Sequence, residues 1–207
     1  MSKDVYGVLC PDAETALENE AYFSDLDGVV GDGDFGYSLA RGFEKVVAEW
    51  DSMDHSLPGN FLKKVGMTIM SAVGGVSGTI WGTVFMRSGM NLGTKTEIIR
   101  DDVISVLRAA IESIKQRGKC DLGDKTYLDT LIPTVDALEK AFDEGKSDSE
   151  ALAIAAKVSA ESAEATRQMI AKRGRAAYTG ERSIGTLDAG SVAVAKIFEK
   201  INKDWNG

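Results

Sequence analysis

A short acidic, glycine-rich segment is the part of this 207-residue sequence best suited to chemistry. It reads SDLDGVVGDGDFGYS and holds four carboxylates, those of Asp25, Asp27, Asp32 and Asp34. Carboxylates packed close together raise each other's pKa unless a cation lies among them. Oxygen ligands suit hard ions such as magnesium or calcium, and glycines let the backbone bend so that several carboxylates converge. We interpret the segment as a metal-binding loop rather than a solvated acidic turn, with all four aspartates as candidates.

Two familiar motifs nearly match this loop and are rejected. Residues Gly31–Gly36 spell G-x-G-x-x-G, the dinucleotide fingerprint, but that motif requires a preceding strand and a βαβ unit. Asp32 and Asp34 begin like an EF-hand calcium loop. The position of the third ligand is a glycine, however, and Glu44 comes one residue too late to close such a loop.

Two later segments supply groups that complement a metal loop. The sequence GGVSG at Gly74–Gly78 ends where a helix begins, so backbone N–H groups and the Ser77 hydroxyl could face an anion there. A helix-capping turn is the alternative interpretation. The segment GRAAYTGERSIGTLDAG carries Arg175, Arg182 and Asp188. Arginine suits phosphate binding and offsets charge during phosphoryl transfer, although a surface salt bridge is the favoured interpretation for Arg182.

Other catalytic schemes find little support in the sequence. Gly118 and Gly123 resemble a P-loop, but Asp124 breaks the G-K-[ST] register and no strand precedes it. The single histidine, His55, lies in the polar connector MDHSLPGN, so a Ser–His–Asp set is not available and a phosphohistidine relay within the chain is not expected. The remaining groups are those of a magnesium–nucleotide site, in which the nucleotide carries the phosphoryl group.

Apolar residues recur with helical periodicity along the chain, and no stretch alternates with period two for long. The clearest stripe runs from Leu128 to Phe142, and about eight helices are predicted in all. Helices that run up and down a bundle place alternate connections at the same end. We therefore expect an all-α, single-domain barrel or bundle over residues 1–207, with the four glycine clusters at one end: 28–36, 74–78, 118–123 and 174–190.

Composition and charge exclude several classes of function. The net charge of −8 argues against nucleic acid as a partner, and no basic amphipathic stretch suits an anionic membrane. No apolar run approaches the roughly 18 residues of a membrane span, and the first residues are too polar for a signal peptide. Two cysteines, Cys10 and Cys120, are too few for a disulfide scaffold or a cysteine metal cluster. A cytoplasmic protein with reduced cysteines is expected.

The four glycine-rich segments together resemble the nucleotide-binding L subunit, or C-terminal domain, of dihydroxyacetone kinases. The resemblance runs from Asp27 to Gly190 and rests on LDGVVGDGDFG, GGVSG, GDKTYLDTLIP and GRAAYTGERSIGTLDAG, in this order. It implies a barrel of eight antiparallel amphipathic helices. It also implies that a separate K subunit holds the substrate through a covalent link to a histidine, and that this chain docks there and delivers the phosphoryl group.

The resemblance also assigns roles to individual residues. It implies that Asp27, Asp32 and Asp34, without Asp25, coordinate two magnesium ions that bridge the phosphates of ADP or ATP. Arg175 would be the catalytic residue that offsets the developing charge. Thr126 and Tyr127 would lie beside the adenine pocket. The full set of implied contacts with the nucleotide and its phosphates is Ser38, Val76, Ser77, Gly118, Thr126, Tyr127, Arg175, Asp188 and Gly190.

The chain departs from the family's usual pattern at three positions. Phe35 stands where a histidine is usual and cannot donate a hydrogen bond to phosphate, Ser38 replaces an asparagine, and Ala189 replaces a proline. Several hypotheses therefore stay open. ADP could remain bound as a cofactor recharged by a phosphotransferase-system protein, or ATP could be consumed; the substrate could be another short ketose, such as a tetrulose. The alternatives are a non-catalytic nucleotide- or metal-binding module and, least supported because the EF-hand register fails, a calcium-binding helical protein.

Overall fold

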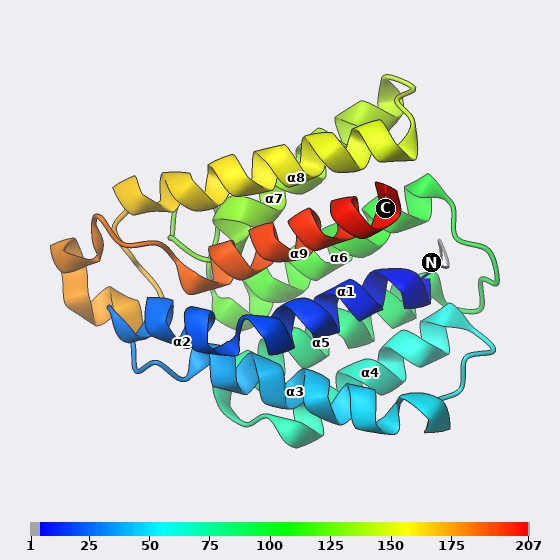
Figure 1. Cartoon of the computed structure of the whole chain (residues 1–207), viewed down its shortest axis with the longest axis horizontal. Coiled ribbons are helices and arrows are strands. Elements are labelled where there is room, and N and C mark those ends of the chain that lie inside the picture. Colours follow the sequence, from blue (N-terminus) through cyan, green and yellow to red (C-terminus); the bar gives the residue numbers. More distant parts are fainter. Residues whose placement is uncertain (1–4, 207) are drawn as a thin grey trace.

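The computed structural model describes the backbone of residues 5–206 and the side chains of residues 11–75 and 77–206. Every regular element in this part of the chain is a helix, which confirms the all-α prediction (Figure 1). Among these helices, none combines the length and the apolar character that a membrane span requires. The α-helices are α1 (Val5–Glu18), α2 (Glu20–Gly28), α3 (Phe35–Glu49), α4 (Pro58–Ala72), α5 (Gly75–Leu92), α6 (Arg100–Gly118), α7 (Tyr127–Asp143), α8 (Asp148–Ala165) and α9 (Ala189–Asn206), joined in places by the 3-10 helices η1 (Trp50–Ser52), η2 (Thr166–Gln168) and η3 (Arg175–Ser183).

Eight of the helices within residues 5–206 close into a ring. Following contacts around it, α1 packs on α3, each helix from α3 to α9 packs on the next, and α9 packs back on α1. The short helix α2 stands apart from this order and packs on α3 and α9. The sequence predicts one weak helix near residues 12–24, whereas the structure divides this region at Asn19 into α1 and α2. The ring itself agrees with the prediction of about eight helices.

The ring surrounds an apolar cavity of about 400 Å³ that is partly open to solvent. Its lining includes Ile80, Leu131 and Phe198, from helices on different sides of the ring. Asp12 of α1 also lines it, and its Oδ1 has no hydrogen-bond partner within the described residues. Burial raises the pKa of Asp12 to about 8, because a low-dielectric surrounding disfavours the charged form. The protonated form of Asp12 is therefore favoured in the folded protein.

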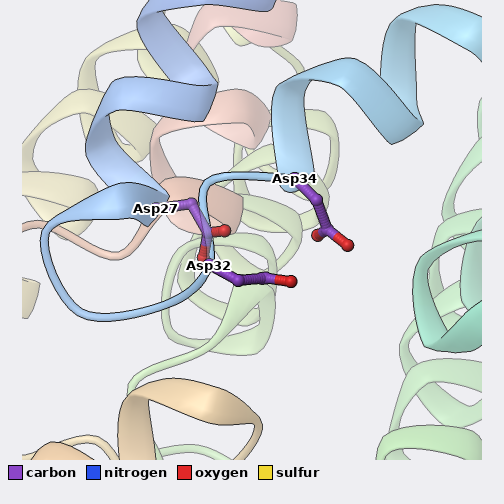
Figure 2. Close-up of side chains that lie close together, drawn as sticks. All are labelled: Asp27, Asp32 and Asp34. Carbon is purple, nitrogen blue, oxygen red and sulfur yellow. The ribbon is translucent and has the colours of Figure 1, made fainter.

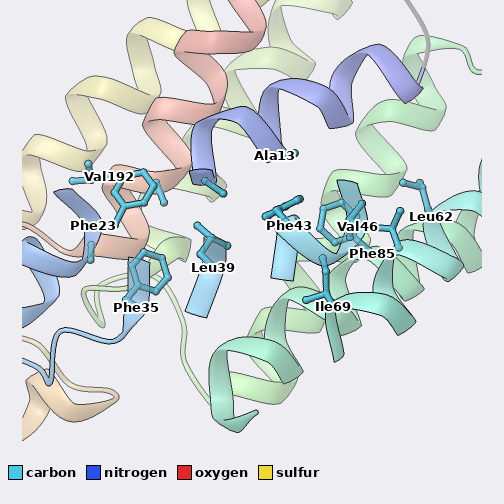
Figure 3. Close-up of a cluster of buried hydrophobic side chains, with 14 of the residues drawn as sticks. Ala13, Phe23, Phe35, Leu39, Phe43, Val46, Leu62, Ile69, Phe85 and Val192 are labelled. Atoms are coloured by element: carbon cyan, nitrogen blue, oxygen red, sulfur yellow. The ribbon is translucent and has the colours of Figure 1, made fainter. Parts of the chain in front are cut away.

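An apolar cluster beside the cavity joins α3 to its neighbours (Figure 3). Phe35, Leu39, Phe43 and Val46 follow the helical repeat along α3 and are all buried. Phe23 of α2 packs against Phe35 with the ring centroids 6.1 Å apart. The first residue of α3 therefore belongs to the core, and this packing fixes where the preceding acidic loop can lie.

Helices α4 and α5 approach each other so closely that their backbones touch. A Cβ added at Gly66 would lie 2.6 Å from the carbonyl oxygen of Gly82, and one added at Gly59 would lie 2.8 Å from that of Gly89. Each pair of glycines on one helix is separated by seven residues, or two turns, so the same face of each helix is used twice. The tight hairpin places the Gly74 connection at the end of the ring where the acidic loop lies (Figure 1).

Candidate metal and nucleotide site

Asp27, Asp32 and Asp34 form a compact carboxylate cluster in the α2–α3 connection. Each offers one oxygen, and these oxygens all lie within 4.8 Å of one another (Figure 2). Asp27 belongs to the last turn of α2 and Asp34 immediately precedes α3, so two helix ends hold the cluster. Asp25, the fourth candidate from charge alone, is not part of this group.

Glycines allow the loop to fold back on Asp27. The N–H of Gly33, whose φ is +74°, donates to Asp27 Oδ2 at 2.9 Å, and the N–H of Gly31 donates to the Asp27 carbonyl. A Cβ at Gly31 would lie 2.4 Å from Asp27 Oδ1. Gly36 permits the next close approach, because a Cβ there would lie 2.0 Å from the carbonyl oxygen of Glu20. The glycine pattern of the sequence is thus required by these contacts.

The chemistry of the three carboxylates fits a hard divalent cation. Partial burial is the largest cause that raises the pKa of Asp34, followed by the negative charge of Asp32; Arg175 acts in the opposite direction. Oxygen-only ligands at this spacing are typical of magnesium sites. A cation among the carboxylates would relieve their repulsion, and the loop leaves Asp32 and Asp34 exposed to solvent, where a metal–phosphate complex could reach them.

Arg175 brings the last glycine-rich segment onto this cluster. Its guanidinium Nη1 donates to Asp32 Oδ2 in an ion pair that spans 143 positions in the sequence. The arginine is the first residue of η3 and follows Gly174, which has a φ of +63°. About two thirds of its side chain (66%) is exposed. The guanidinium therefore reaches the carboxylate cluster from the solvent side.

The second glycine segment forms the first turn of α5 rather than a loop before it. Gly74 is the N-cap residue and α5 begins at Gly75, so Ser77 lies where the free N–H groups of a helix start point outward. Ser77 and Gly78 share a small pocket with Ser38 of α3. The side chain of Val76 lies outside the described residues. The structure thus brings Ser38 and Ser77 together beside a helix N-terminus, where free N–H groups could face an anion.

The remaining predicted residues lie where α6, α7 and α9 end or begin. Gly118 is the last residue of α6, and Thr126 is the N-cap of α7, with its hydroxyl accepting from the N–H of Leu128. Asp188 Oδ2 accepts from the Ser191 N–H at 2.7 Å at the start of α9. Burial is the main cause that raises the pKa of Asp188 to about 6.

Tyr127 lies inside the bundle beneath these helix ends. Its ring makes edge contacts with Phe35 and Trp81, at centroid distances of 5.8 Å in each case. Gly190 packs flat against it, since a Cβ there would lie 2.7 Å from the Tyr127 ring. Tyr127 and Gly190 therefore pack together at the start of α7, and the resemblance expects the adenine to lie beside Tyr127.

Contacts among the four segments confirm that they meet at one end of the ring. The first and fourth are joined by the ion pair between Asp32 and Arg175, and the first and second by the pocket that Ser38 and Ser77 share. The segment GDKTYLDTLIP, which follows the third glycine cluster, is joined to the fourth through Lys125, whose ammonium contacts residues of the 169–186 segment. In the sequence, Lys125 is part of a broken P-loop pattern, and nothing local indicates this contact.

Comparison with known proteins identifies one family. The model of the DAK2 domain matches residues 29–203. The PEP-dependent dihydroxyacetone kinase ADP-binding subunit DhaL of Escherichia coli (strain K12) is 36% identical over 173 residues, which cover 84% of this chain and 82% of the relative. The PTS-dependent subunit DhaL of Lactococcus lactis is 36% identical over 188 residues, which cover 91% of this chain and 90% of the relative.

Longer proteins also match over nearly the whole chain. The L-erythrulose 1-kinase of Mycolicibacterium smegmatis is 31% identical over 204 residues, which are 98% of this chain and 35% of that protein. The crystal structure of the dihydroxyacetone kinase from C. freundii in complex with AMP-PNP and Mg2+ superposes with a TM-score of 0.76 at 22% identity, covering 98% of this chain and 34% of that one. The chain belongs to the DAK2-domain family, with the DhaL-type ADP-binding subunits of dihydroxyacetone kinases.

Proposed function

We propose that this chain is the nucleotide-binding, phosphoryl-transferring subunit of a dihydroxyacetone-type kinase. One observation carries the proposal: the oxygens of Asp27, Asp32 and Asp34 converge within 4.8 Å, and the guanidinium of Arg175 reaches the same cluster. A metal-bound polyphosphate needs both features, namely oxygen ligands for the metal and a cation for the terminal phosphate. The DhaL relatives, which are named as ADP-binding subunits, support the assignment.

The three aspartates would hold two magnesium ions against the nucleotide phosphates. Bound magnesium would supply positive charge that offsets the charge developing on the transferred phosphoryl group. Arg175 would donate hydrogen bonds to that group from the solvent side, as its present contact with Asp32 suggests. Because a cation stabilises neighbouring carboxylates, magnesium would also keep Asp34 ionised despite the local repulsion.

The nucleotide would lie across the remaining helix ends. The first turn of α5, with Ser77 and the backbone of Val76, would bind phosphate oxygens together with Ser38. The adenine would be bordered by Thr126, Tyr127 and Gly118, and Gly190 would support the ring of Tyr127 from behind. Asp188 would mainly stabilise the start of α9, where its Oδ2 accepts a hydrogen bond from the Ser191 N–H.

The phosphoryl acceptor would be a short ketose held on a separate K subunit. The mode that the DhaL names favour keeps ADP bound as a cofactor, recharged by a phosphotransferase-system protein, because the relatives are called PEP-dependent or PTS-dependent. The other mode consumes ATP. The erythrulose kinases among the relatives make a tetrulose a second candidate acceptor.

A reconstitution assay separates these possibilities. The purified chain is mixed with a K subunit, magnesium and either ATP alone or ADP with the phosphotransferase proteins and phosphoenolpyruvate, with dihydroxyacetone and erythrulose as parallel acceptors. Ketose phosphate formed only with the phosphotransferase components supports the cofactor mode, whereas turnover with ATP alone rejects it. Magnesium-dependent ADP binding without transfer in any combination would indicate a non-catalytic module and reject the kinase assignment.

A further inference from the structure

Lys125 is a buried cation in the connection between α6 and α7. Its residue is 3% exposed, and its backbone adopts a left-handed conformation with a φ of +59°. That conformation is uncommon for a residue with a side chain. A lysine is rarely buried unless its ammonium finds partners that replace water. The contacts of this side chain must therefore offset two costs, the burial of its charge and its left-handed backbone conformation.

The partners of the ammonium all belong to the segment that carries Arg175. Nζ donates to three carbonyl oxygens, which are those of Ser183, of Met169 at 3.3 Å and of Thr186 at 2.9 Å. It also donates to Thr186 Oγ1 at 3.1 Å. Met169 precedes Arg175 in the chain, and Ser183 and Thr186 follow it. The ammonium therefore joins the two ends of the 169–186 segment, which contains η3.

The residues on either side of Lys125 extend the same connection. Asp124 Oδ2 accepts from Arg173 Nε at 3.1 Å, and the Asp124 carbonyl accepts from the Lys172 N–H at 3.1 Å. The carbonyl of Thr126 accepts from Ser191 Oγ at 2.8 Å, at the start of α9. Three consecutive residues thus contact the chain on both sides of η3. Asp124 contacts residues 172 and 173 before it, Lys125 contacts residues before and after it, and Thr126 contacts Ser191 at the start of α9. We name residues 124–126 the brace.

We propose that Lys125 is a positioning residue, which sets the place of Arg175 against the carboxylate cluster by holding together the two ends of the 169–186 segment. Arg175 lies two residues beyond Arg173, which the brace holds, and its own side chain is mostly exposed. Its reach toward Asp32 is therefore defined by the base of the segment rather than by packing around the guanidinium. The role in transfer rests on the proposed function, whereas the holding of the segment does not.

The test uses Lys125→Met, which keeps the length of the side chain and removes the ammonium. Lys172→Met is the matched control, because it removes a more exposed cation from the same neighbourhood, 3.6 Å from Asp124. Amide hydrogen exchange is measured on both full-length variants without nucleotide. We expect exchange within residues 169–186 to rise at least tenfold in Lys125→Met and less than threefold in Lys172→Met, with α4 unchanged in both. Equal protection in Lys125→Met and the unchanged protein would overturn the proposal.

A double-mutant cycle tests whether this holding acts through Arg175. Transfer to the K-subunit substrate is measured for Lys125→Met, Arg175→Ala and the double variant. If Lys125 acts through Arg175, the double variant loses no more than about threefold beyond Arg175→Ala alone, while independent losses that multiply would contradict the positioning role. If Lys125→Met does not fold, Thr186→Val removes one acceptor and should raise exchange in the segment severalfold; unchanged exchange there also overturns the proposal. A chain that shows the exchange result but neither binds Mg–ADP nor transfers refutes the proposed function while leaving the holding role supported.

Discussion

Two short segments at the same end of the ring, each containing aspartate, arrange their charges in opposite ways. In the metal loop, residues 27–34, the carboxylates of Asp27, Asp32 and Asp34 face one another. In the brace, the Asp124 carboxylate faces Arg173 and Lys172, and the Lys125 ammonium faces carbonyl oxygens. Like charges gather in the first segment, where Arg175 pairs with Asp32 from the solvent side. In the second, the carboxylate pairs with cations and the ammonium is held by carbonyl oxygens.

This difference separates a ligand site from a support. A group of like charges opposes folding and can be stabilised by a ligand of opposite sign, whereas matched charges stabilise the fold itself. Neutralising a carboxylate should therefore cost ligand binding in the metal loop and stability in the brace.

Replacing two carboxylates of the metal loop should abolish metal-dependent binding without harming the fold. For Asp32→Asn with Asp34→Asn, we expect the affinity for ADP in the presence of magnesium to fall at least a hundredfold, or about 2.7 kcal/mol. The free energy of unfolding should change little, because the repulsion that is removed offsets the loss of the exposed ion pair between Asp32 and Arg175. Calorimetric titration with and without magnesium, together with thermal melting, measures both quantities.

The matched control for this pair is Asp25→Asn, which changes a nearby carboxylate that is outside the cluster. Its affinity for Mg–ADP should stay within about threefold of the unchanged protein. If the double variant still binds ADP with the same magnesium dependence, the metal loop is not the metal site and the comparison fails.

Asp12 is a third kind of carboxyl, with a buried Oδ1 that has no hydrogen-bond partner among the described residues, and it should affect stability through pH. Its pKa is about 8 in the folded protein against 3.8 for the ordinary group, so the unfolded chain binds fewer protons between these values. Stability then falls as pH rises from about 4 to about 8. Asp12→Asn lacks this loss, and its advantage over the unchanged protein should grow by about 1 kcal/mol per pH unit, or about 2 kcal/mol from pH 5 to pH 7.

Urea unfolding at several pH values measures this advantage. A constant difference between Asp12→Asn and the unchanged protein across pH 5 to 8 would show that the carboxyl ionises normally. Binding of Mg–ADP should be the same in both proteins at each pH, because Asp12 lines the cavity within the ring and is not part of the carboxylate cluster.

Neutralising the brace carboxylate should lower stability. Burial alone would raise the pKa of Asp124, but its hydrogen bonds with the Asp121 N–H and Arg173, and the charges of Arg173 and Lys172, bring it below the ordinary value. This stabilisation is present at neutral pH and is lost as the pH falls through the lowered pKa. Asp124→Asn should cost about 1.5 kcal/mol in urea unfolding at pH 7 and progressively less as the pH falls through that lowered pKa.

The control in the same connection is Asp121→Asn, whose carboxylate is exposed and pairs with Lys115 at 3.0 Å. An exposed pair of this kind contributes little to stability, so Asp121→Asn should cost much less than Asp124→Asn. Equal losses at the two positions would mean that the brace is no more than a surface ion-pair network.

The boundary between site and scaffold passes between Asp34 and Phe35, and restoring a histidine at position 35 should confirm it. Phe35 is 7% exposed and packs on Phe23 and Tyr127, so its side chain points into the core. For Phe35→His we expect the affinity for Mg–ADP to change less than threefold, about 0.7 kcal/mol, with a loss of stability. A tenfold gain in affinity would place this position in the site. Phe35→Leu, which keeps an apolar side chain, controls for lost packing.

The fold was largely predictable because its rules are local. Stripes such as the one from Leu128 to Phe142 predict helices, and alternation of the chain predicts that the glycine clusters share an end. The closure of the ring by α1 on α9 was not predictable, since it depends on contacts between the two ends of the chain. The break at Asn19 was missed because the pattern there is weak.

The candidate site divides in the same way. The carboxylate cluster could be predicted because its residues lie within one loop, while Lys125 could not, because its partners lie 44 to 61 positions away. Phe35 was interpreted in the sequence as a lost phosphate contact. Its spacing from Leu39 and Phe43 continues the apolar stripe of α3, and this signal indicates the core position that the structure shows.

The glycine contacts between α4 and α5 have a consequence for the order of folding. The two helices are adjacent in the chain, so the contacts of Gly66 with Gly82 and of Gly59 with Gly89 close short loops and cost little chain entropy. Contacts that are local in sequence form quickly, whereas the closure of α9 on α1 joins distant parts of the chain and must come later. The hairpin that presents the first turn of α5 would thus be an early folding unit, assembled before the ring that the rest of the chain completes around it.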